Sequence, residues 1–197
     1  MKIAGVIIAG GRSSRMGREK ALAMLAGKAL LSHVIERIGP LVTAVVINVN
    51  GDPERFAAFG LTVIADRLPG IGSPLAGLHA ALSFARDEGF DAVLTVPSDA
   101  PFMPRDLARR LAEVHSTAAL AASAGQQHFL TGLWSHGLLE ELEAAIRDAG
   151  LVRVKDWAKS CGAAVVEWPN EPYDPFFNVN TPDELAEARR IAVEFNP

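Results

Sequence analysis

Residues 7–20, IIAGGRSSRMGREK, place a pair of glycines directly before a cluster of positive charge. An apolar run leads into Gly10 and Gly11, and four cations follow them: Arg12, Arg15, Arg18 and Lys20. Paired glycines let the backbone adopt positive φ and bring its N–H groups close to a ligand, as anion-binding turns require. The chain as a whole carries a net charge of −4, so solubility does not explain this local excess of cations. The pattern predicts a loop that binds a polyphosphate.

The spacing within this loop excludes two common phosphate-binding motifs. A P-loop ends in Gly-Lys-Ser/Thr, whereas Gly17 is followed here by Arg18, Glu19 and Lys20. The dinucleotide fingerprint G-x-G-x-x-G is also missing. The loop reads instead G-G-x-S-x-R-M-G-x-x-K, from Gly10 to Lys20. A glycine turn can be a simple connection, but the placed Arg and Lys residues favour a nucleotide-phosphate site.

The elements that would position this loop follow from the hydrophobic pattern. Apolar β-branched runs alternate with helical periodicity, which predicts a mostly parallel sheet covered by helices on both faces. We expect strands at 3–9, 43–49, 61–65, 91–96, 118–122, 129–134 and 163–168, and a short extended piece at 176–179. We expect helices at 29–38, 53–59, 75–86, 104–114, 138–149, 152–160 and 182–193. The first strand is apolar on both faces and should be central. With no repeat or linker, residues 1–197 form one domain.

Polar residues follow each of the first four predicted strands. In doubly wound sheets, ligands bind beyond the carboxyl ends of the strands, where the strand order reverses. Gly10 follows the first strand, Asn48 ends the second, Asp66 follows the third and Asp99 follows the fourth. Taken alone, Asn48 or Asp66 could equally be a turn former. Together these residues predict one binding edge.

Asp99 is the strongest candidate for a metal ligand. It lies between Pro97 and Pro101, which stiffen the backbone, and it follows a buried strand. A nucleoside triphosphate carries about four negative charges and a phosphate monoester about two more, so the cations and a divalent ion would have to offset both. A fixed carboxylate beside a polyphosphate suits a Mg²⁺ bridge. Catalysis would then be in-line displacement at phosphorus by positioning and electrostatics.

Asn178 and Asn180 form a second candidate cluster, just before the predicted last helix. Thr181 is suited to cap that helix, but capping does not explain two amides at alternate positions. In an extended segment these side chains point the same way and could bind a metal or a phosphate. A plain helix cap is the alternative.

Composition excludes several other classes of function. The acidic balance argues against nucleic acid as a partner, and the apolar N-terminal run is too short to span a membrane. Cys161 is the only cysteine, so no intrachain disulfide can form and we expect a cytoplasmic protein. The histidines show no metal-ligand spacing, and we expect them at surface or core positions: His33, His79, His115, His128 and His136.

Six stretches of this chain resemble the MobA-like NTP transferases, a family that includes molybdenum cofactor guanylyltransferases. They are IIAGGRSSRMGREKAL, VVINVN, VIADRLPG, SPLAGLHAAL, TVPSDAPFMP and FNVNTPDEL. The resemblance covers nearly the full length. It implies an α/β protein with the nucleotidyltransferase fold: a Rossmann-like three-layer α/β/α sandwich with one antiparallel strand in a mostly parallel sheet.

The resemblance also implies a reaction. GMP would pass from GTP to the terminal phosphate of molybdenum-loaded molybdopterin, with Mg²⁺ as cofactor and pyrophosphate as the second product. Residues 1–101 would mainly bind GTP and Mg²⁺, and residues 102–197 would mainly bind molybdopterin and partners. Asp99 would hold Mg²⁺, and Arg15 would stabilise the phosphate under attack. The GTP contacts would be Ile8, Ala9, Gly10, Lys20, Asn48, Asp66 and Asp99, and the molybdopterin contacts Asn178 and Asn180.

Some questions remain open on the sequence. The same fold could use CTP on molybdopterin or an NTP on a sugar phosphate. One departure from the family is His128-Phe129-Leu130-Thr131, where the family tends to place His-Pro before the antiparallel strand.

We expect a monomer with GTP and molybdopterin as small-molecule substrates. Molybdoenzymes and other proteins of cofactor biosynthesis would be its protein partners.

Overall fold

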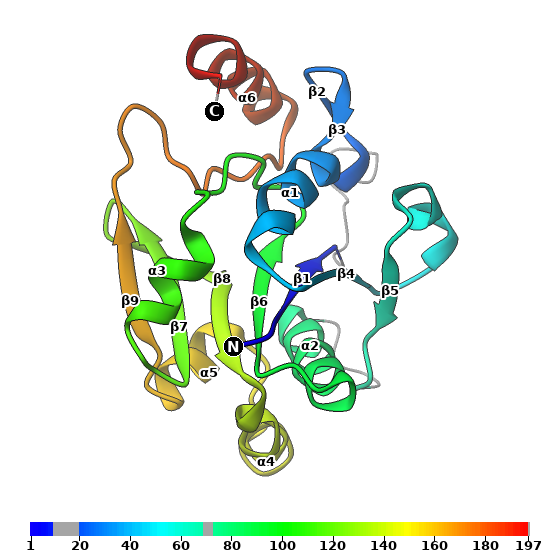
Figure 1. Ribbon diagram of the computed structural model, residues 1–197, viewed down its shortest axis with the longest axis vertical. Helices are drawn as coiled ribbons and strands as arrows, with labels where there is room; N and C mark the ends of the chain where they lie inside the picture. Colours follow the sequence, from blue (N-terminus) through cyan, green and yellow to red (C-terminus); the bar gives the residue numbers. More distant parts are fainter. Residues whose placement is uncertain (10–19, 69–72, 197) are drawn as a thin grey trace.

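A computed structural model of the chain describes residues 1–9, 20–68 and 73–196 (Figure 1). Its centre is a seven-stranded sheet with the order β5-β4-β1-β6-β8-β7-β9. The strands are β1 (Ile3–Ile8), β4 (Ala44–Val49), β5 (Thr62–Ala65), β6 (Ala92–Pro97), β7 (Ala118–Ser123), β8 (Gln126–Ser135) and β9 (Ala164–Trp168). Within this sheet β8 runs antiparallel to both of its neighbours, and the other pairings are parallel. The predicted sheet, with one antiparallel strand, is confirmed.

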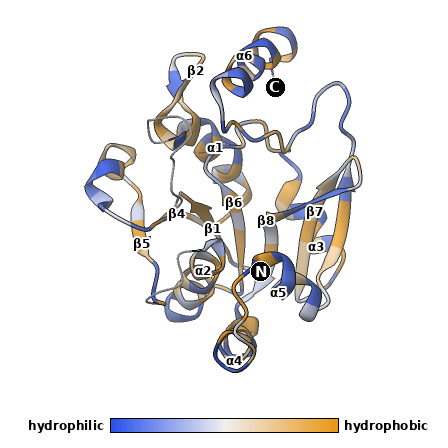
Figure 2. Ribbon diagram, turned by 180° about the vertical axis from the view of Figure 1, so that it is seen from behind, coloured by the Kyte–Doolittle hydropathy of each residue, from blue (hydrophilic) through white to orange (hydrophobic). Residues whose placement is uncertain are grey.

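Helices cover both faces of the sheet, as predicted (Figure 1, Figure 2). The α-helices are α1 (Leu30–Ile38), α2 (Pro74–Glu88), α3 (Leu107–Glu113), α4 (Leu139–Ala149), α5 (Val154–Ser160) and α6 (Pro182–Phe195). Short 3-10 helices are η1 (Lys20–Leu22), η2 (Gly39–Leu41), η3 (Pro53–Phe59) and η4 (His136–Leu138). The predicted helix over 53–59 is thus a 3-10 helix.

The alternating side chains of β1 connect the two layers of helices. Ile3 and Ile7 belong to a core cluster shared with α1 and α3, whereas Ala4, Val6 and Ile8 belong to the cluster shared with α2, α4 and α5. This is the two-residue period of a strand buried on both faces. The central position predicted for this strand is confirmed, since β1 pairs with β4 on one side and β6 on the other.

A small hairpin and the last helix form a third apolar cluster at one end of the molecule (Figure 1). The hairpin consists of β2 (Met24–Leu25) and β3 (Lys28–Ala29), which the sequence did not predict. Both residues of its turn, Ala26 and Gly27, have positive φ, and alanine gives no signal for such a turn. The predicted extended piece at 176–179 is not a strand. The predicted N-cap Thr181 is confirmed by its bond from the Glu184 amide.

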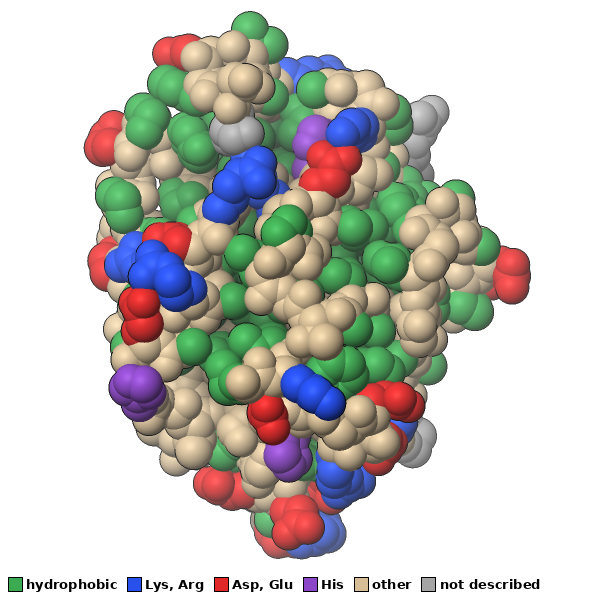
Figure 3. Space-filling model, viewed as in Figure 1, with side chains coloured by type: hydrophobic (Ala, Val, Ile, Leu, Met, Phe, Trp, Pro, Cys, Tyr) green, Lys and Arg blue, Asp and Glu red, His purple; other side chains and the backbone are tan. Residues whose placement is uncertain are grey.

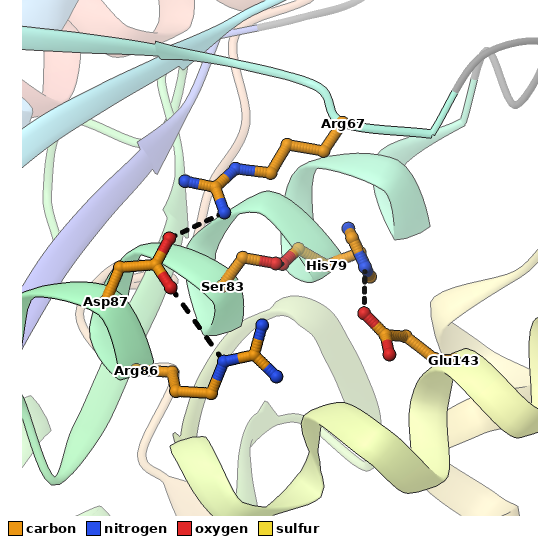
Figure 4. Close-up of polar contacts among 6 residues, drawn as sticks. All are labelled: Arg67, His79, Ser83, Arg86, Asp87 and Glu143. Carbon is orange, nitrogen blue, oxygen red and sulfur yellow. Dashed lines mark hydrogen bonds and ion pairs between the residues drawn. The ribbon is translucent and has the colours of Figure 1, made fainter.

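Helix α2 is tied to its surroundings by polar contacts (Figure 4). His79 Nε2 lies 3.0 Å from Glu143 Oε1 of α4, and Arg67 donates to Asp87 Oδ2 at 2.7 Å, which joins the segment after β5 to the end of α2. Exposed pairs such as Arg67–Asp87 contribute little to stability. The direction of α2, whose first turns border the carboxyl edge of the sheet, is therefore set mainly by the burial of Leu75, Leu78 and Leu82 in the core.

Positive and negative side chains lie close together on the face drawn in Figure 3. The described surface includes ion pairs such as Lys28–Glu36 and Arg109–Glu113, both at 2.6 Å. A surface that tracks nucleic acid needs an excess of cations. Among the described residues, no helix is long and apolar enough to cross a membrane.

Strand β8 carries a bulge on the side of β7. Leu120 pairs with Gly132 and the next residue, Ala121, pairs with His128, so one step along β7 corresponds to four along β8. Residues 129–131 therefore form the bulge, and Gly132 marks the point where regular pairing resumes. A Cβ built on Gly132 lies 2.8 Å from the Ala119 carbonyl oxygen and 2.9 Å from Leu120 Cδ2.

We predict that Gly132→Ala lowers the free energy of unfolding by about 1–3 kcal/mol, because the added methyl group must push the neighbouring backbone away. Urea unfolding would measure this loss. Gly137→Ala is the matched control, since the nearest atom there is Ser135 Oγ at an ordinary 3.6 Å. Equal stability of the two variants would contradict the assigned register.

Candidate functional site

The candidate site lies where β1 and β6 end side by side. The chain runs from β1 outward through β4 to β5, and then crosses to β6 on the other side of β1, so the strand order reverses here. The Ala9 amide donates to the Asn48 carbonyl at 2.8 Å, and the Ser98 amide donates to the Ile8 carbonyl at 3.3 Å. These bonds fix the ends of three strands at one edge. The predicted site residues Gly10 and Arg15 lie outside the described residues.

Lys20 joins this edge to the distant end of the chain. Its Nζ donates a hydrogen bond to Asn180 Oδ1 at 2.6 Å, across 160 residues of sequence. Asn180 is held in turn, because its amide donates to Glu184 Oε2 at 2.6 Å. The backbone amide of Glu184 donates to Thr181 Oγ1, the N-cap of α6, so the start of α6 orients the side chain that contacts the lysine.

Asp99 lies beside this bridge and is partly buried. Its carbonyl accepts a hydrogen bond from the Val179 amide at 2.9 Å, which joins the loop after β6 to the segment before α6. Burial raises the pKa of the Asp99 carboxyl; the charge of Lys20 opposes this rise, and the charge of Glu184 adds to it. The ionised carboxylate is therefore only partly compensated, and a cation beside it would be favoured.

Asn48 and Asp66 form a second polar group on the other side of β1. Asn48 is 1% exposed, and its Nδ2 donates to Asp66 Oδ1 at 3.0 Å and to the Ile64 carbonyl at 3.4 Å. A Cβ on Gly77 would lie 2.6 Å from Asn48 Oδ1, so glycine lets α2 approach the amide closely. The bond from Asn48 fixes Asp66 at the sheet edge. It uses only Oδ1 of the Asp66 carboxylate and leaves Oδ2 unused by Asn48.

A cavity of about 340 Å³ opens beside Asp99. Its walls are the loop after β6, the start of β8 and the segment before α6. Its lining residues are Pro97, Asp99, residues 126–131, Phe176, Asn178 and Asn180. The volume suits a small organic molecule. The two predicted amides and the predicted metal ligand therefore line the same cavity.

The predicted residues thus fall into two groups. Lys20, Asp99, Asn178 and Asn180 surround one region, and Asn48 with Asp66 forms another. Ile8 and Ala9, at the end of β1, lie between these two groups, because β1 pairs with β4 on one side and with β6 on the other. The sequence interpretation missed the role of β8, which contributes Gln126, Gln127 and His128 to the cavity. The stretch His128-Phe129-Leu130-Thr131, which departs from the His-Pro of the family, lies in this wall.

The described residues suit a metal ion that binds to the protein and to a substrate at once, rather than a metal ion that protein ligands enclose on all sides. No group of three or more His, Cys, Asp or Glu side chains among them could hold a metal ion. Mg²⁺ commonly binds through one or two carboxylates together with substrate phosphates and water. Asp99, with its partly compensated charge, meets that requirement on the protein side.

The sequence and fold match known nucleotidyltransferases. Residues 5–177 match the model of the MobA-like NTP transferase domain. The molybdenum cofactor guanylyltransferase of Nitrobacter hamburgensis is 44% identical over 95% of this chain and 93% of its own, and that of Rhizobium meliloti is 45% identical over 93% and 88%. The crystal structure of molybdopterin-guanine dinucleotide biosynthesis protein A from Archaeoglobus fulgidus superposes with a TM-score of 0.75, at 26% identity, over 99% of this chain and 100% of that one. The chain therefore belongs to the MobA-like NTP transferase family.

Proposed function

We propose that this chain transfers GMP from GTP to the terminal phosphate of molybdenum-loaded molybdopterin, forming the guanine dinucleotide and pyrophosphate. The observation that carries the proposal is the position of Asp99, which lies at the strand-order reversal between Lys20, the predicted phosphate ligand, and a cavity of substrate size. The names of the relatives support the choice of both substrates.

The nucleotide would bind along the ends of β1, β4 and β5. Ile8, Ala9 and Gly10 would lie against it, and Lys20 would contact its phosphates. A guanine ring presents N–H donors on its Watson–Crick edge, and a carboxylate such as Asp66 can accept hydrogen bonds from them. Asn48 would hold that carboxylate in position, because its amide already donates to Asp66 Oδ1.

The chemical step would be an in-line attack of the acceptor phosphate on the α-phosphorus of GTP. Lys20 and Arg15 would neutralise charge on the phosphate under attack. Mg²⁺ held by Asp99 would supply further charge neutralisation as a Lewis acid when bound. Asn178 and Asn180 would contact the acceptor phosphate, so the Lys20–Asn180 bond couples the nucleotide side of the site to the acceptor side.

The two halves of the chain would divide this work. Residues 1–101 supply most of the GTP and Mg²⁺ contacts, and residues 102–197 supply most of the acceptor cavity. We propose that the protein acts as a monomer in the cytoplasm and that its product passes to molybdoenzymes, with other proteins of cofactor biosynthesis as partners.

Pyrophosphate release by the purified protein tests the function directly. With Mg²⁺ and molybdenum-loaded molybdopterin, we expect release from GTP and little from CTP, ATP or UTP. Omitting the pterin should stop release, because the acceptor phosphate is the nucleophile. Turnover with CTP alone would assign the sister cytidylyl transfer, and turnover with a sugar phosphate in place of the pterin would assign a different acceptor.

Asp99→Asn should lower the transfer rate at least 100-fold, because the electrostatic contribution of a positioned group is of this order. The fold should persist. Burial raises the pKa of Asp99, so its ionised form opposes folding above that pKa and a neutral amide removes the cost. Thermal unfolding would check this, with an unchanged or higher Tm expected. Asp91→Asn, at the exposed opposite end of β6, is the matched control. Near-normal activity of Asp99→Asn would remove the metal assignment.

Lys20→Ala should weaken GTP binding by about 1.5–3 kcal/mol, the range for a charge-assisted contact to phosphate. Calorimetric titration with GTP would measure the change. Lys28→Ala serves as the comparison, since Lys28 is exposed and pairs with Glu36. If both variants bind GTP as the unmodified protein does, Lys20 is not a phosphate ligand.

A further inference from the structure

Three polar side chains form a hydrogen-bonded chain at the wall of the cavity beside Asp99. Ser123 ends β7 and is 1% exposed. Its Oγ lies 2.7 Å from His128 Nε2 and donates to Asp174 Oδ1 at 2.8 Å. His128 itself lines the cavity. The phosphoryl transfer described above uses none of these three groups.

The direction of the protons in this chain follows from a count of donors. A serine hydroxyl has one proton, and here it is donated to Asp174. Ser123 Oγ can therefore only accept from the imidazole, so His128 carries its proton on Nε2. Because the hydroxyl donates to the carboxylate and not to the histidine, His128 cannot activate Ser123 as a nucleophile.

Packing fixes the plane of the imidazole. The ring of His128 lies 4.7 Å from that of Phe176, at an interplanar angle of 34°, and Phe176 packs edge-on against Trp168 at 5.5 Å. Burial lowers the pKa of His128, and the charges of Asp174 and Glu167 oppose this only in part. At neutral pH the ring is therefore uncharged, and its second nitrogen, Nδ1, has a lone pair.

That second nitrogen is available to a ligand. Among the described residues, His128 Nδ1 has no hydrogen-bond partner, yet it is not one of the enclosed atoms without a partner, which are His79 Nδ1 and Trp157 Nε1. His128, with Nδ1 as its remaining acceptor, lines a cavity whose walls also include Phe129, Gln126 and Gln127. Aromatic walls with a few fixed polar groups are typical of sites for flat heterocycles.

We propose that His128 recognises the ring system of the acceptor, its Nδ1 accepting a hydrogen bond from an amino or ring N–H group of the pterin. Ser123 and Asp174 act as positioning residues, because they hold the imidazole in the tautomer that leaves Nδ1 unprotonated. This inference rests on the proposed function, since it assigns a side chain to the acceptor of that reaction. It makes His128 a determinant of acceptor specificity and leaves the nucleotide side unaffected.

Two substitutions at position 128 separate recognition from a structural role. The side-chain oxygen of asparagine is two bonds from Cβ, like Nδ1, whereas the nitrogen of glutamine is three bonds from Cβ, like Nε2. His128→Asn therefore keeps an acceptor near Nδ1 and loses the bond to Ser123, and His128→Gln does the reverse. We expect His128→Gln to raise the KM for molybdopterin roughly tenfold, His128→Asn to raise it less, and both to leave the Kd for GTP unchanged. The opposite order of the two variants would overturn the proposal.

Nitrogen-15 NMR of the full chain with labelled histidine gives a readout independent of turnover. The His128 signals should report the Nε2–H tautomer, and the Nδ1 signal should shift on addition of molybdopterin but not of GTP. Ser123→Ala should abolish the single tautomer. Ser83→Ala is the matched control, because Ser83 is also 1% exposed and donates to the His79 carbonyl away from the cavity.

The outcomes distinguish this inference from the proposed function. If molybdopterin binds and reacts while the Nδ1 signal stays unchanged, the role of His128 is wrong and the transferase function stands. If the unmodified protein neither binds molybdopterin nor releases pyrophosphate with it, the proposed function fails, and the assignment of His128 fails with it.

Discussion

The hydrogen bond between Lys20 Nζ and Asn180 Oδ1 is the contact on which the rest of the site depends. It joins the start of η1 to the segment before α6, and Asp99 lies beside both. The apolar cluster next to it supports the same approach, since Leu25 and Leu30 near the hairpin pack with Val179 and Ile191. The bond therefore orders side chains from both ends of the chain around one carboxylate. Burial of the apolar cluster supplies most of the stabilisation, because a single partly buried hydrogen bond contributes little.

The charge of Lys20 explains how metal and nucleotide binding would be coupled. Burial disfavours the ionised form of Asp99, and Lys20 is the main group that offsets this cost. A bound polyphosphate would compete for the same ammonium group, so the compensation available to Asp99 would fall. A divalent cation shared between the carboxylate and the phosphates would restore it. Under the proposed function, the metal would therefore bind together with the nucleotide rather than before it.

The sequence predicted the sheet and one part of the site well, for a physical reason. The ends of parallel strands meet at one edge, so Asn48, Asp66 and Asp99 could be grouped from the strand pattern alone, and they lie at that edge in the structure, with Asp99 on the other side of β1 from Asn48 and Asp66. The contacts between distant segments could not be predicted in this way. The bond from Lys20 to Asn180 depends on how the last helix docks, and hydrophobic periodicity carries no information about that docking. The sequence also gave no sign of the bulge before Gly132, because register shifts depend on tertiary packing rather than on local propensity.

The antiparallel direction of β8 explains why the acceptor cavity is built from this strand. In a fully parallel sheet each strand begins at the edge opposite the site and brings only its last residues to it. Because β8 runs the other way, its first residues lie at the site edge, next to the last residues of β7, from which Ser123 reaches His128. The bulge at residues 129–131 then lets β8 leave the regular ladder exactly where the cavity opens, and Gly132 allows the ladder to resume against the Ala119 carbonyl. One reversed strand thus adds a wall that contains Phe129 and the uncharged His128 to an edge that carries the charged side chains of Lys20 and Asp99, as a substrate with both a heterocyclic ring and a phosphate requires.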